Sequence, residues 1–467
     1  YWEGHSPPGG WVCQCDRDGK QFELLTCGFR NPYDLVVLPG GRVLTYDSDM
    51  EWDLGTPWYR PTRVLEVIPG VDYGWRIGSA KWPADYPECP PAWMDIGPGS
   101  PTGMARCGDG FVMLDWTFGL LYLHAGVLGG CAPALRGAPW PVADVADGYV
   151  VTGGRGLPSR LLQIEPTVWS QWTSWMPPSV LLAEVEPLSW GVWWLLANVD
   201  PAAQRAEVLA ALTDKEPRRR LAGLVALART GTTSDLPQVL DGLGALPFAS
   251  LEGTEQQIAW LRAHALGLMR LGPANEAQRA LIAQRLLPLF PTGNERVDQD
   301  LCELLAYVDA PGLLDKAVPL LAELRPSPVP AWASVQEGSD VYGSQYSGVI
   351  AAMAKSMPPI GQLAIADALR IVKHGWTLAQ RRTYFRFLQQ ARKRKGGASY
   401  DGFVKKIIDA AYATCTPAEQ RELAELVGAA KADAPAVVAP PPRGPGRDWQ
   451  LADADALLQP GLDGADR

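Results

Sequence analysis

The sequence lacks paired-cysteine motifs, long apolar runs and dense basic segments. Its eight cysteines form neither C-x-x-C nor C-x-x-C-H, which argues against structural zinc and covalently attached haem within the chain. No segment approaches the roughly 18 consecutive apolar residues of a spanning helix, so we predict no membrane span. The formal charge of -9 and the shortness of the basic clusters at 218–220 and 392–395 argue against nucleic acid as a partner.

The chain is long and apolar enough for more than one hydrophobic core. It has 467 residues, of which 47% are hydrophobic, and we expect about two or three domains. It begins at Tyr1 rather than at methionine, so we expect it to be a piece of a longer protein. Six of the eight cysteines lie before residue 132, a distribution that permits disulfides in an oxidising compartment.

The segment from Gly28 to Arg63 combines turn residues, apolar runs and a dense group of charges. Two apolar runs, LVVL and RVLTY, flank a Pro-Gly-Gly sequence, and this pattern predicts a β-hairpin. The second run leads directly into four carboxylates, which are Asp47, Asp49, Glu51 and Asp53. Such a cluster requires compensation by a cation, by solvent or by nearby arginines. A solvated acidic loop is the alternative reading.

Residues 1–168 are expected to be all β. Their apolar runs are short and are separated by turn residues, as in a sandwich or a propeller. Strand pairs recur about every 40 to 50 residues with Asp-Gly or Gly-Gly turns, which favours the propeller. About three to four blades fit into this length, so we predict the C-terminal part of a β-propeller whose other blades lie upstream of Tyr1.

The rest of the chain divides into three segments. Residues 169–199 form a tryptophan-rich bridge, which we expect to hold the β part against the helices rather than to seat a ligand. Residues 200–433 place apolar residues at helical spacing and predict a HEAT-like α-helical repeat domain. Residues 434–467 form a proline-rich linker and tail. The predicted fold class is multidomain β plus α, a partial β-propeller followed by a helical repeat.

Several motifs together resemble one protein family. In the β part these are GFRNPYDL, TYDSDMEWDLGTPWYRPTRV, DYGWRIGSAKWP, DIGPGSPTG, LDWTFGLLY and VVTGGRG, and in the helical part NERVDQDLCELLAYVDAP and KGGASYDGFVKKI. They are similar to the large bacterial membrane-bound dehydrogenases of planctomycete type, which often carry a haem-binding domain. The propeller of that family is distantly similar to the soluble quinoprotein glucose and sorbosone dehydrogenases.

The resemblance implies a cofactor site in the β part. An Arg-Asn-Pro sequence of this type contributes to the quinone pocket in the quinoprotein group, so Arg30 and Asn31 would face the central channel. Arg155, in GGRG, would match a late-blade arginine of the same region. Guanidinium groups bind the carboxylates of pyrroloquinoline quinone (PQQ) bidentately and stack on its rings. Trp75 is a further candidate for the pocket, although a tryptophan in this setting also packs blades together.

Calcium is the second cofactor that the resemblance implies, because it polarises the quinone in such enzymes. It takes oxygen ligands, which the acidic run supplies. The candidate calcium ligands are Asp47, Asp49, Glu51 and Asp53. A calcium-dependent, lectin-like propeller is a further reading of these residues.

The resemblance implies an extracytoplasmic, periplasmic dehydrogenase that oxidises a sugar or an alcohol. In the family, a segment similar to residues 444–449 precedes a cytochrome c domain, which would accept the electrons. This chain has no C-x-x-C-H haem site, and no histidine of its β part matches the family's catalytic base, so we expect the chain alone not to be competent. The alternative is a non-catalytic propeller and solenoid that bind carbohydrate, or a protein partner on the helical repeat.

Overall fold

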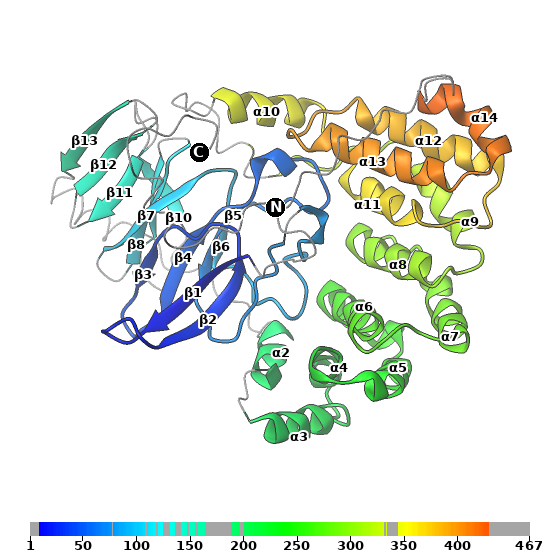
Figure 1. The fold of residues 1–467 in the computed structure, drawn as a ribbon, viewed down its shortest axis with the longest axis horizontal. Helices are drawn as coiled ribbons and strands as arrows, with labels where there is room; N and C mark the ends of the chain where they lie inside the picture. The colour runs from blue at the N-terminus through cyan, green and yellow to red at the C-terminus, as the bar shows by residue number, and fades with distance from the viewer. Residues whose placement is uncertain are drawn as a thin grey trace, which may run out of the picture. The chain divides into compact units, whose positions relative to one another are not determined.

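A computed structural model gives the fold of residues 9–76, 78–107, 110–117, 120–124, 131–135, 142–146, 149–154, 157–163, 188–196, 200–330, 333 and 344–428. Strands occupy the first part of the chain and helices the second (Figure 1). The described residues up to Val427 belong to one compact unit. The predicted linker and tail at 434–467 lies outside the described residues.

The strands form antiparallel sheets in which neighbours along the chain pair in succession. A two-stranded sheet consists of β1 (Gly10–Cys15) and β2 (Phe22–Phe29). The first four-stranded sheet consists of β3 (Leu35–Val37), β4 (Val43–Asp47), β5 (Thr62–Glu66) and β6 (Met94–Gly97). The second consists of β7 (Pro101–Cys107), β8 (Gly110–Asp115), β9 (Leu120–His124) and β10 (Cys131–Leu135). A three-stranded sheet contains β11 (Val142–Ala146), β12 (Tyr149–Gly154) and β13 (Leu157–Gln163).

The β3–β4 hairpin forms where the sequence predicts it. The two strands pair in antiparallel register, and the turn between them contains Gly40 and Gly41 at φ values of 88° and 84°. Residues with a side chain are strained at such φ values, so the Gly-Gly pair suits this turn. Strand β4 ends at Asp47, and the acidic segment follows directly.

The core of the β part joins the two four-stranded sheets. Alternate residues of a strand point to one face of the sheet, and those of β4, β5 and β8 that point inward include Leu44, Val64 and Phe111, all buried. The same cluster includes Met353 of α10 (Ser344–Lys355). A helix from much later in the chain therefore completes the core of the sheets.

The helical part is a succession of short helices. It begins with α2 (Leu188–Leu196), α3 (Pro201–Ala211), α4 (Pro217–Thr230), α5 (Leu236–Gly244), α6 (Gly253–Arg270) and α7 (Glu276–Leu286). It continues with α8 (Glu295–Tyr307), α9 (Leu313–Ala317), α10, α11 (Ile360–Leu369), α12 (Leu378–Arg392), α13 (Tyr400–Ala413) and α14 (Pro417–Val427). Helix α4 packs against α6, α6 against α8, and α8 against α11 (Figure 1). Their apolar faces share one continuous core.

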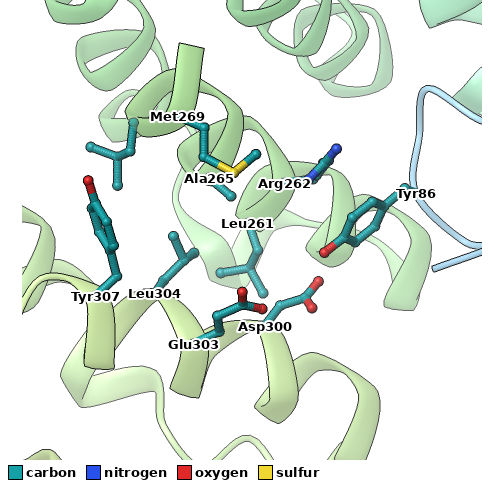
Figure 2. A pocket seen from close by; sticks show the side chains of 10 residues that line it. Tyr86, Leu261, Arg262, Ala265, Met269, Asp300, Glu303, Leu304 and Tyr307 are labelled. Atoms are coloured by element: carbon teal, nitrogen blue, oxygen red, sulfur yellow. The ribbon is translucent and has the colours of Figure 1, made fainter. Parts of the chain in front are cut away.

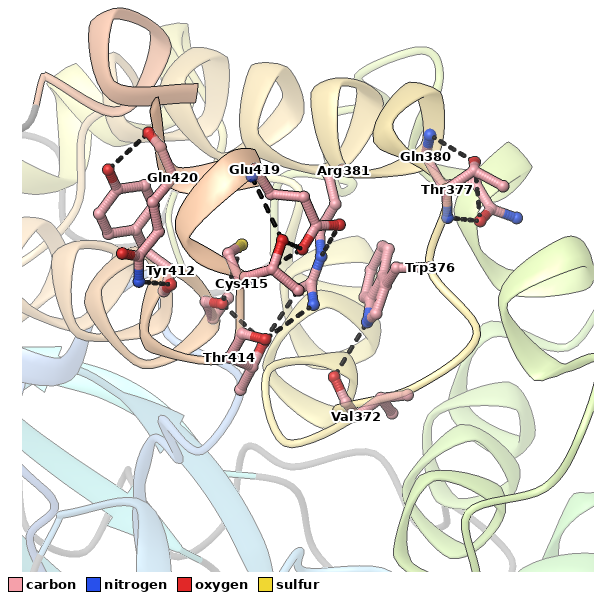
Figure 3. Close-up of polar contacts among 12 residues, drawn as sticks. Val372, Trp376, Thr377, Gln380, Arg381, Tyr412, Thr414, Cys415, Glu419 and Gln420 are labelled. Atoms are coloured by element: carbon pink, nitrogen blue, oxygen red, sulfur yellow. Dashed lines mark hydrogen bonds and ion pairs between the residues drawn. The ribbon is translucent and has the colours of Figure 1, made fainter. Parts of the chain in front are cut away.

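A buried arginine connects the last helices (Figure 3). The guanidinium of Arg381 in α12 lies 4.3 Å from the centroid of the Trp376 ring. Its Nη1 donates a hydrogen bond to Thr414 Oγ1 at 3.0 Å, in the turn between α13 and α14. The Glu419 carboxylate lies 3.9 Å from its Nε. Because Arg381 is only 1% exposed, these contacts must compensate most of its lost hydration.

The acidic segment packs against the helical part. Its residues 51–53 form a single 3-10 turn. The carbonyl oxygens of Trp52 and Leu54 accept hydrogen bonds from the backbone N–H groups of Ser399 and Gly397, at 2.9 and 2.8 Å. A Cβ atom on Gly397 would overlap the Trp52 carbonyl oxygen, so this close approach requires glycine. The segment is therefore a structural junction as well as a candidate site.

Trp193 of α2 forms a second junction with the β part. Its indole Nε1 donates to the Pro69 carbonyl oxygen at 3.1 Å, and its ring packs against a small apolar cluster that includes Phe29 and Tyr73. This contact accords with the structural role expected for the tryptophan-rich bridge, which stays a prediction. The tryptophans of the bridge before residue 188 lie outside the described residues.

Two further observations concern the described chain as a whole. No single helix in it is long and apolar enough to cross a membrane, and only the bent pair Gly348–Lys355 and Ile360–Leu369, at 83°, meets that criterion when both halves are taken together. Six of its cysteines are free thiols: Cys13, Cys15, Cys27, Cys89, Cys302 and Cys415.

Candidate functional site

The Arg-Asn-Pro turn after β2 is fixed by Asp47. The backbone N–H groups of Arg30 and Asn31 donate to the Asp47 carboxylate at 3.1 and 2.7 Å. Burial raises the pKa of this carboxyl. The Arg30 side chain is half-buried and donates from Nη1 to Ser48 Oγ at 2.8 Å, whereas Asn31 is exposed. The turn therefore presents a guanidinium and an amide from a well-anchored backbone.

Lys81 compensates two of the four carboxylates in the acidic segment. Its Nζ lies 2.5 Å from Asp49 Oδ1 and 2.9 Å from Asp53 Oδ2, and its side chain is 1% exposed. Asp49 Oδ2 also accepts the backbone N–H of Arg60 at 3.0 Å. A buried ion pair survives only when its charges are paired and hydrogen-bonded in this way. The lysine ammonium thus supplies the positive charge that these two carboxylates require.

Glu51 is the titratable carboxyl next to the turn. Its Oε1 accepts the backbone N–H of Gly99 at 3.2 Å. Burial raises the pKa of Glu51 to about 7, and the Arg30 guanidinium opposes that rise. A carboxyl with a pKa near neutrality exchanges a proton readily at physiological pH, as a general base must.

Arg60 and Arg63 are buried beside the acidic segment, each 5% exposed. Arg60 donates from Nη1 to the carbonyl oxygens of Tyr73 and Trp82 at 3.0 and 3.1 Å, and burial lowers its pKa to about 10. Arg63 lies opposite Asp47 in the β4–β5 pairing. The charges of Arg63 and Arg60 oppose the burial that raises the pKa of Asp47, whereas the direct ion pairs of the acidic run are made by Lys81.

Trp75 lies beside the turn because its backbone N–H donates to the Gly28 carbonyl oxygen at 2.9 Å. Its Nε1 is buried and has no hydrogen-bond partner within the described residues. A buried donor without an acceptor costs roughly 1 to 3 kcal/mol, so an acceptor on a ligand would be favoured here. Trp82 differs, because the guanidinium groups of Arg76 and Arg262 lie over its ring at 5.0 and 5.5 Å. Its ring is therefore already engaged by arginine side chains.

The predictions of a calcium site and of a role for Arg155 both stay predictions. Within the described ranges, no group of three or more His, Cys, Asp or Glu side chains is arranged to hold a metal ion. Protein groups engage the four carboxylates instead, and Lys81 is shared by Asp49 and Asp53, so these contacts give no support to calcium binding, which stays a prediction. Arg155 lies outside the described residues.

Two groups of residues escape sequence reasoning. Lys81 occurs in the motif GSAKWP, where a single lysine among small and aromatic residues is the available signal for a buried ion pair. Asp300 and Glu303 lie one turn apart on α8 and line a pocket with Tyr86 and Arg262. Two carboxylates at this spacing on an amphipathic helix are the available signal for that pocket.

Comparisons with known proteins give limited similarity. No protein-family profile matches this chain, and neither does any curated protein. A PQQ-bound aldose sugar dehydrogenase from Streptomyces coelicolor is 18% identical over 33% of this chain and 51% of its own, with a TM-score of 0.26. An oxidoreductase of Thermus thermophilus, assigned as a glucose dehydrogenase, is 20% identical over 30% of this chain and 47% of its own, with a TM-score of 0.24. The chain spans about half the length of each of these proteins.

The site near the turn thus combines three chemical elements. They are the half-buried guanidinium of Arg30 on an anchored backbone, the unpartnered indole N–H of Trp75, and the Glu51 carboxyl that titrates near neutrality. A guanidinium and an N–H donor bind a planar, carboxylated ligand. A carboxyl of this pKa accepts a proton from a bound hydroxyl group.

Proposed function

We propose that this chain is part of an extracytoplasmic quinoprotein-type dehydrogenase whose β part contributes to a PQQ site and which oxidises a sugar or an alcohol. The observation that carries the proposal is the turn anchored by Asp47, which presents Arg30 and Asn31 beside Trp75. The motif resemblance supports the same cofactor. In this proposal the four-stranded antiparallel sheets are blades of a partial propeller, and residues 200–433 form a HEAT-like repeat.

The residues present fit PQQ. Arg30 retains N–H donors beyond the one bonded to Ser48, so it would pair with a carboxylate of the cofactor. Trp75 would donate its free N–H to the same ligand. Glu51 would take up the proton of the substrate hydroxyl on its carboxylate. When bound, the quinone supplies two-electron oxidation, and the proposed electron acceptor is a cytochrome c-type domain outside this chain.

Calorimetric titration with PQQ in the presence of calcium chloride tests this proposal. We expect micromolar binding to the wild-type chain and a loss of affinity of about tenfold or more in Arg30→Ala. Arg42→Ala is the matched control, because Arg42 is exposed and pairs with Glu66 on the same sheet without contacting the turn. Replacing calcium with a chelator tests the calcium prediction. A folded wild-type chain that releases no heat, or equal losses in both variants, would overturn the assignment of the turn.

A non-catalytic scaffold is the second candidate function. It is favoured by the contacts of the acidic segment, whose carboxylates are engaged by Lys81 and the backbone of Arg60 and whose own backbone is bonded to Gly397. The segment therefore has a complete structural role without any ligand. In this case carbohydrate or protein partners would bind elsewhere on the chain, and the same titration would show no PQQ binding.

A further inference from the structure

A pocket of about 100 Å³ lies between α6, α8 and the loop that carries Tyr86 (Figure 2). Leucine side chains from both helices, including Leu261 and Leu304, form an apolar wall. Met269 and Tyr307 also line the pocket and are 64% and 44% exposed. The pocket therefore opens to solvent near these two residues and is enclosed at the opposite side.

Two carboxyl groups from α8 face this apolar wall, and one of them has an unsatisfied oxygen. Asp300 is 8% exposed, and its Oδ1 accepts a hydrogen bond from Arg296 Nη1 at 2.6 Å. Its Oδ2 is buried and has no hydrogen-bond partner within the described chain. Figure 2 shows the carboxyl groups of Asp300 and Glu303 directed toward α6. An unpaired buried carboxylate oxygen favours a ligand that brings a hydrogen-bond donor.

The arginine that lines the pocket is already paired. Arg262 donates to Glu88 Oε1 from Nε at 2.8 Å and from Nη2 at 2.5 Å, and its guanidinium lies 4.0 Å from the centroid of the Tyr86 ring. It therefore does not reach across to supply the donor that Asp300 Oδ2 lacks. Its charge is compensated by Glu88, so it does not set the charge of the pocket.

The charges around the pocket leave a surplus of negative charge. Arg296 is shared between Asp85 and Asp300, and Arg229 lies 3.7 Å from the Glu88 that Arg262 already holds. Glu303 also lies near the ion pair of Arg370 and Asp367, so four guanidinium groups face the carboxylates of five residues, which are Asp85, Glu88, Asp300, Glu303 and Asp367. Burial raises the pKa of Asp300 to about 6, as expected for a carboxyl that lacks full compensation.

We propose that this pocket binds an alkylammonium group, carried by a free amine or by a lysine side chain of another molecule. The ammonium donates hydrogen bonds to Asp300 Oδ2 and to the Glu303 carboxylate. Its positive charge offsets the surplus negative charge of the pocket. The alkyl chain lies against Leu261 and Leu304. The Tyr307 ring at the opening adds a cation–π or apolar contact. The proposal is independent of the quinone site, because no residue is shared between the two.

Calorimetric titration of the full chain with n-butylammonium chloride tests this proposal, with n-butanol as the uncharged probe of the same shape. We expect the amine to bind at millimolar concentration and the alcohol to bind about tenfold more weakly or not at all. Asp300→Asn and Glu303→Gln are each expected to weaken amine binding by about tenfold. Asp241→Asn is the matched control, because Asp241 is an exposed carboxylate on α5 outside the pocket.

Asp300 also accepts a hydrogen bond from Arg296, so Asp300→Asn changes a structural contact as well as the proposed ligand site. A second variant therefore separates a loss of binding from a loss of stability. Ala265→Phe fills the pocket from α6 without touching any charge and is expected to abolish amine binding while leaving thermal unfolding near that of the wild type. A parallel titration with N-acetyl-lysine amide distinguishes the two sources of the alkylammonium group. Tighter binding than that of butylammonium favours a lysine side chain, and weaker binding favours a free amine. Equal binding of butanol and butylammonium, or affinities within about twofold of wild type in both carboxylate variants, would overturn the proposal. Arg30→Ala should bind the amine normally, which separates this test from that of the quinone site.

Discussion

The acidic segment after β4 and the pocket on α8 both hold carboxylates in buried surroundings, but the two places differ in how those carboxylates are compensated. In the segment, Asp49 and Asp53 share the ammonium of Lys81. In the pocket, Asp300 Oδ2 has no partner within the described residues. The first cluster is dense along the sequence, and the second consists of two residues on one helix. The dense cluster forms a structural junction, whereas the unsatisfied oxygen of Asp300, which faces a pocket, is the place where we propose that a ligand binds.

The largest expected effect comes from removing the cation of the acidic segment. Lys81→Met leaves the buried carboxylates of Asp49 and Asp53 without their shared partner. Loss of one partner of a buried pair costs about 3 to 5 kcal/mol in unfolding free energy. Urea denaturation measures it. Lys20→Met is the control, because the Lys20 pair with Asp18 is 77% and 72% exposed and should contribute almost nothing.

The same variant tests the calcium prediction. If calcium restores the stability of Lys81→Met but does not change that of the wild type, the carboxylates can bind a metal ion once the ammonium is gone. If Lys81→Met unfolds at the same urea concentration as the wild type, the segment does not depend on this ion pair. In that case the contrast between the two clusters fails.

A smaller loss is expected at the buried arginine of α12. Arg381→Met removes the hydrogen bond to Thr414 and the contact with the Trp376 ring, which together contribute about 2 to 4 kcal/mol when desolvated. The next residue supplies the control, because Arg382 has a 47% exposed side chain and pairs with Glu422 at the surface. Arg382→Met should unfold like the wild type. If Arg381→Met and Arg382→Met have equal free energies of unfolding, the contacts of the buried Arg381 do not stabilise the fold.

Local sequence patterns account for much of the fold. The runs LVVL and RVLTY with their Gly-Gly turn correctly predict β3 and β4. Strand β7 is harder to predict because it begins at Pro101 and contains Gly103, both unusual within strands. The apolar spacing from 312 to 324 predicts one helix, but α9 ends at Ala317 and a 3-10 turn that includes Pro319 follows.

The candidate sites are less accessible to sequence reasoning. The turn at Arg30 and the acidic run are visible because neighbouring residues form them. Lys81 lies 32 residues from Asp49 in sequence, and nothing in the local pattern specifies that pairing. The free oxygen of Asp300 depends on how α6, α8 and the Tyr86 loop pack, since each removes or supplies donors. Local periodicity predicts which side chains are buried, but not which of their polar atoms remain without a partner.

His264 provides the smallest expected effect and tests whether an unpartnered buried atom always calls for a ligand. This residue of α6 is fully buried, its Nδ1 lies 2.9 Å from the Trp260 carbonyl oxygen, and its Nε2 has no partner among the described residues. Burial lowers its pKa to about 4. Its ring lies 4.3 Å from that of Trp260, in a T-shaped arrangement inside the apolar core. The imidazole is therefore kept neutral by its surroundings rather than completed by a ligand.

The pH dependence of stability follows from this pKa. The unfolded chain takes up a proton on His264 below an ordinary pKa of about 6.5, whereas the folded chain does so only near 4. The contribution of His264 to the free energy of unfolding is therefore greatest above pH 6.5 and falls as the pH drops toward 4. It decreases by about 2 kcal/mol between pH 7 and pH 5. The test compares the change in unfolding free energy between pH 7 and pH 5 in the wild type with the same change in His264→Leu. The contributions of Glu51 and Asp300 are common to both proteins and cancel in this comparison. His374→Leu, at an exposed turn, should keep the wild-type slope, and an unchanged slope in His264→Leu would mean that the buried imidazole is not held neutral.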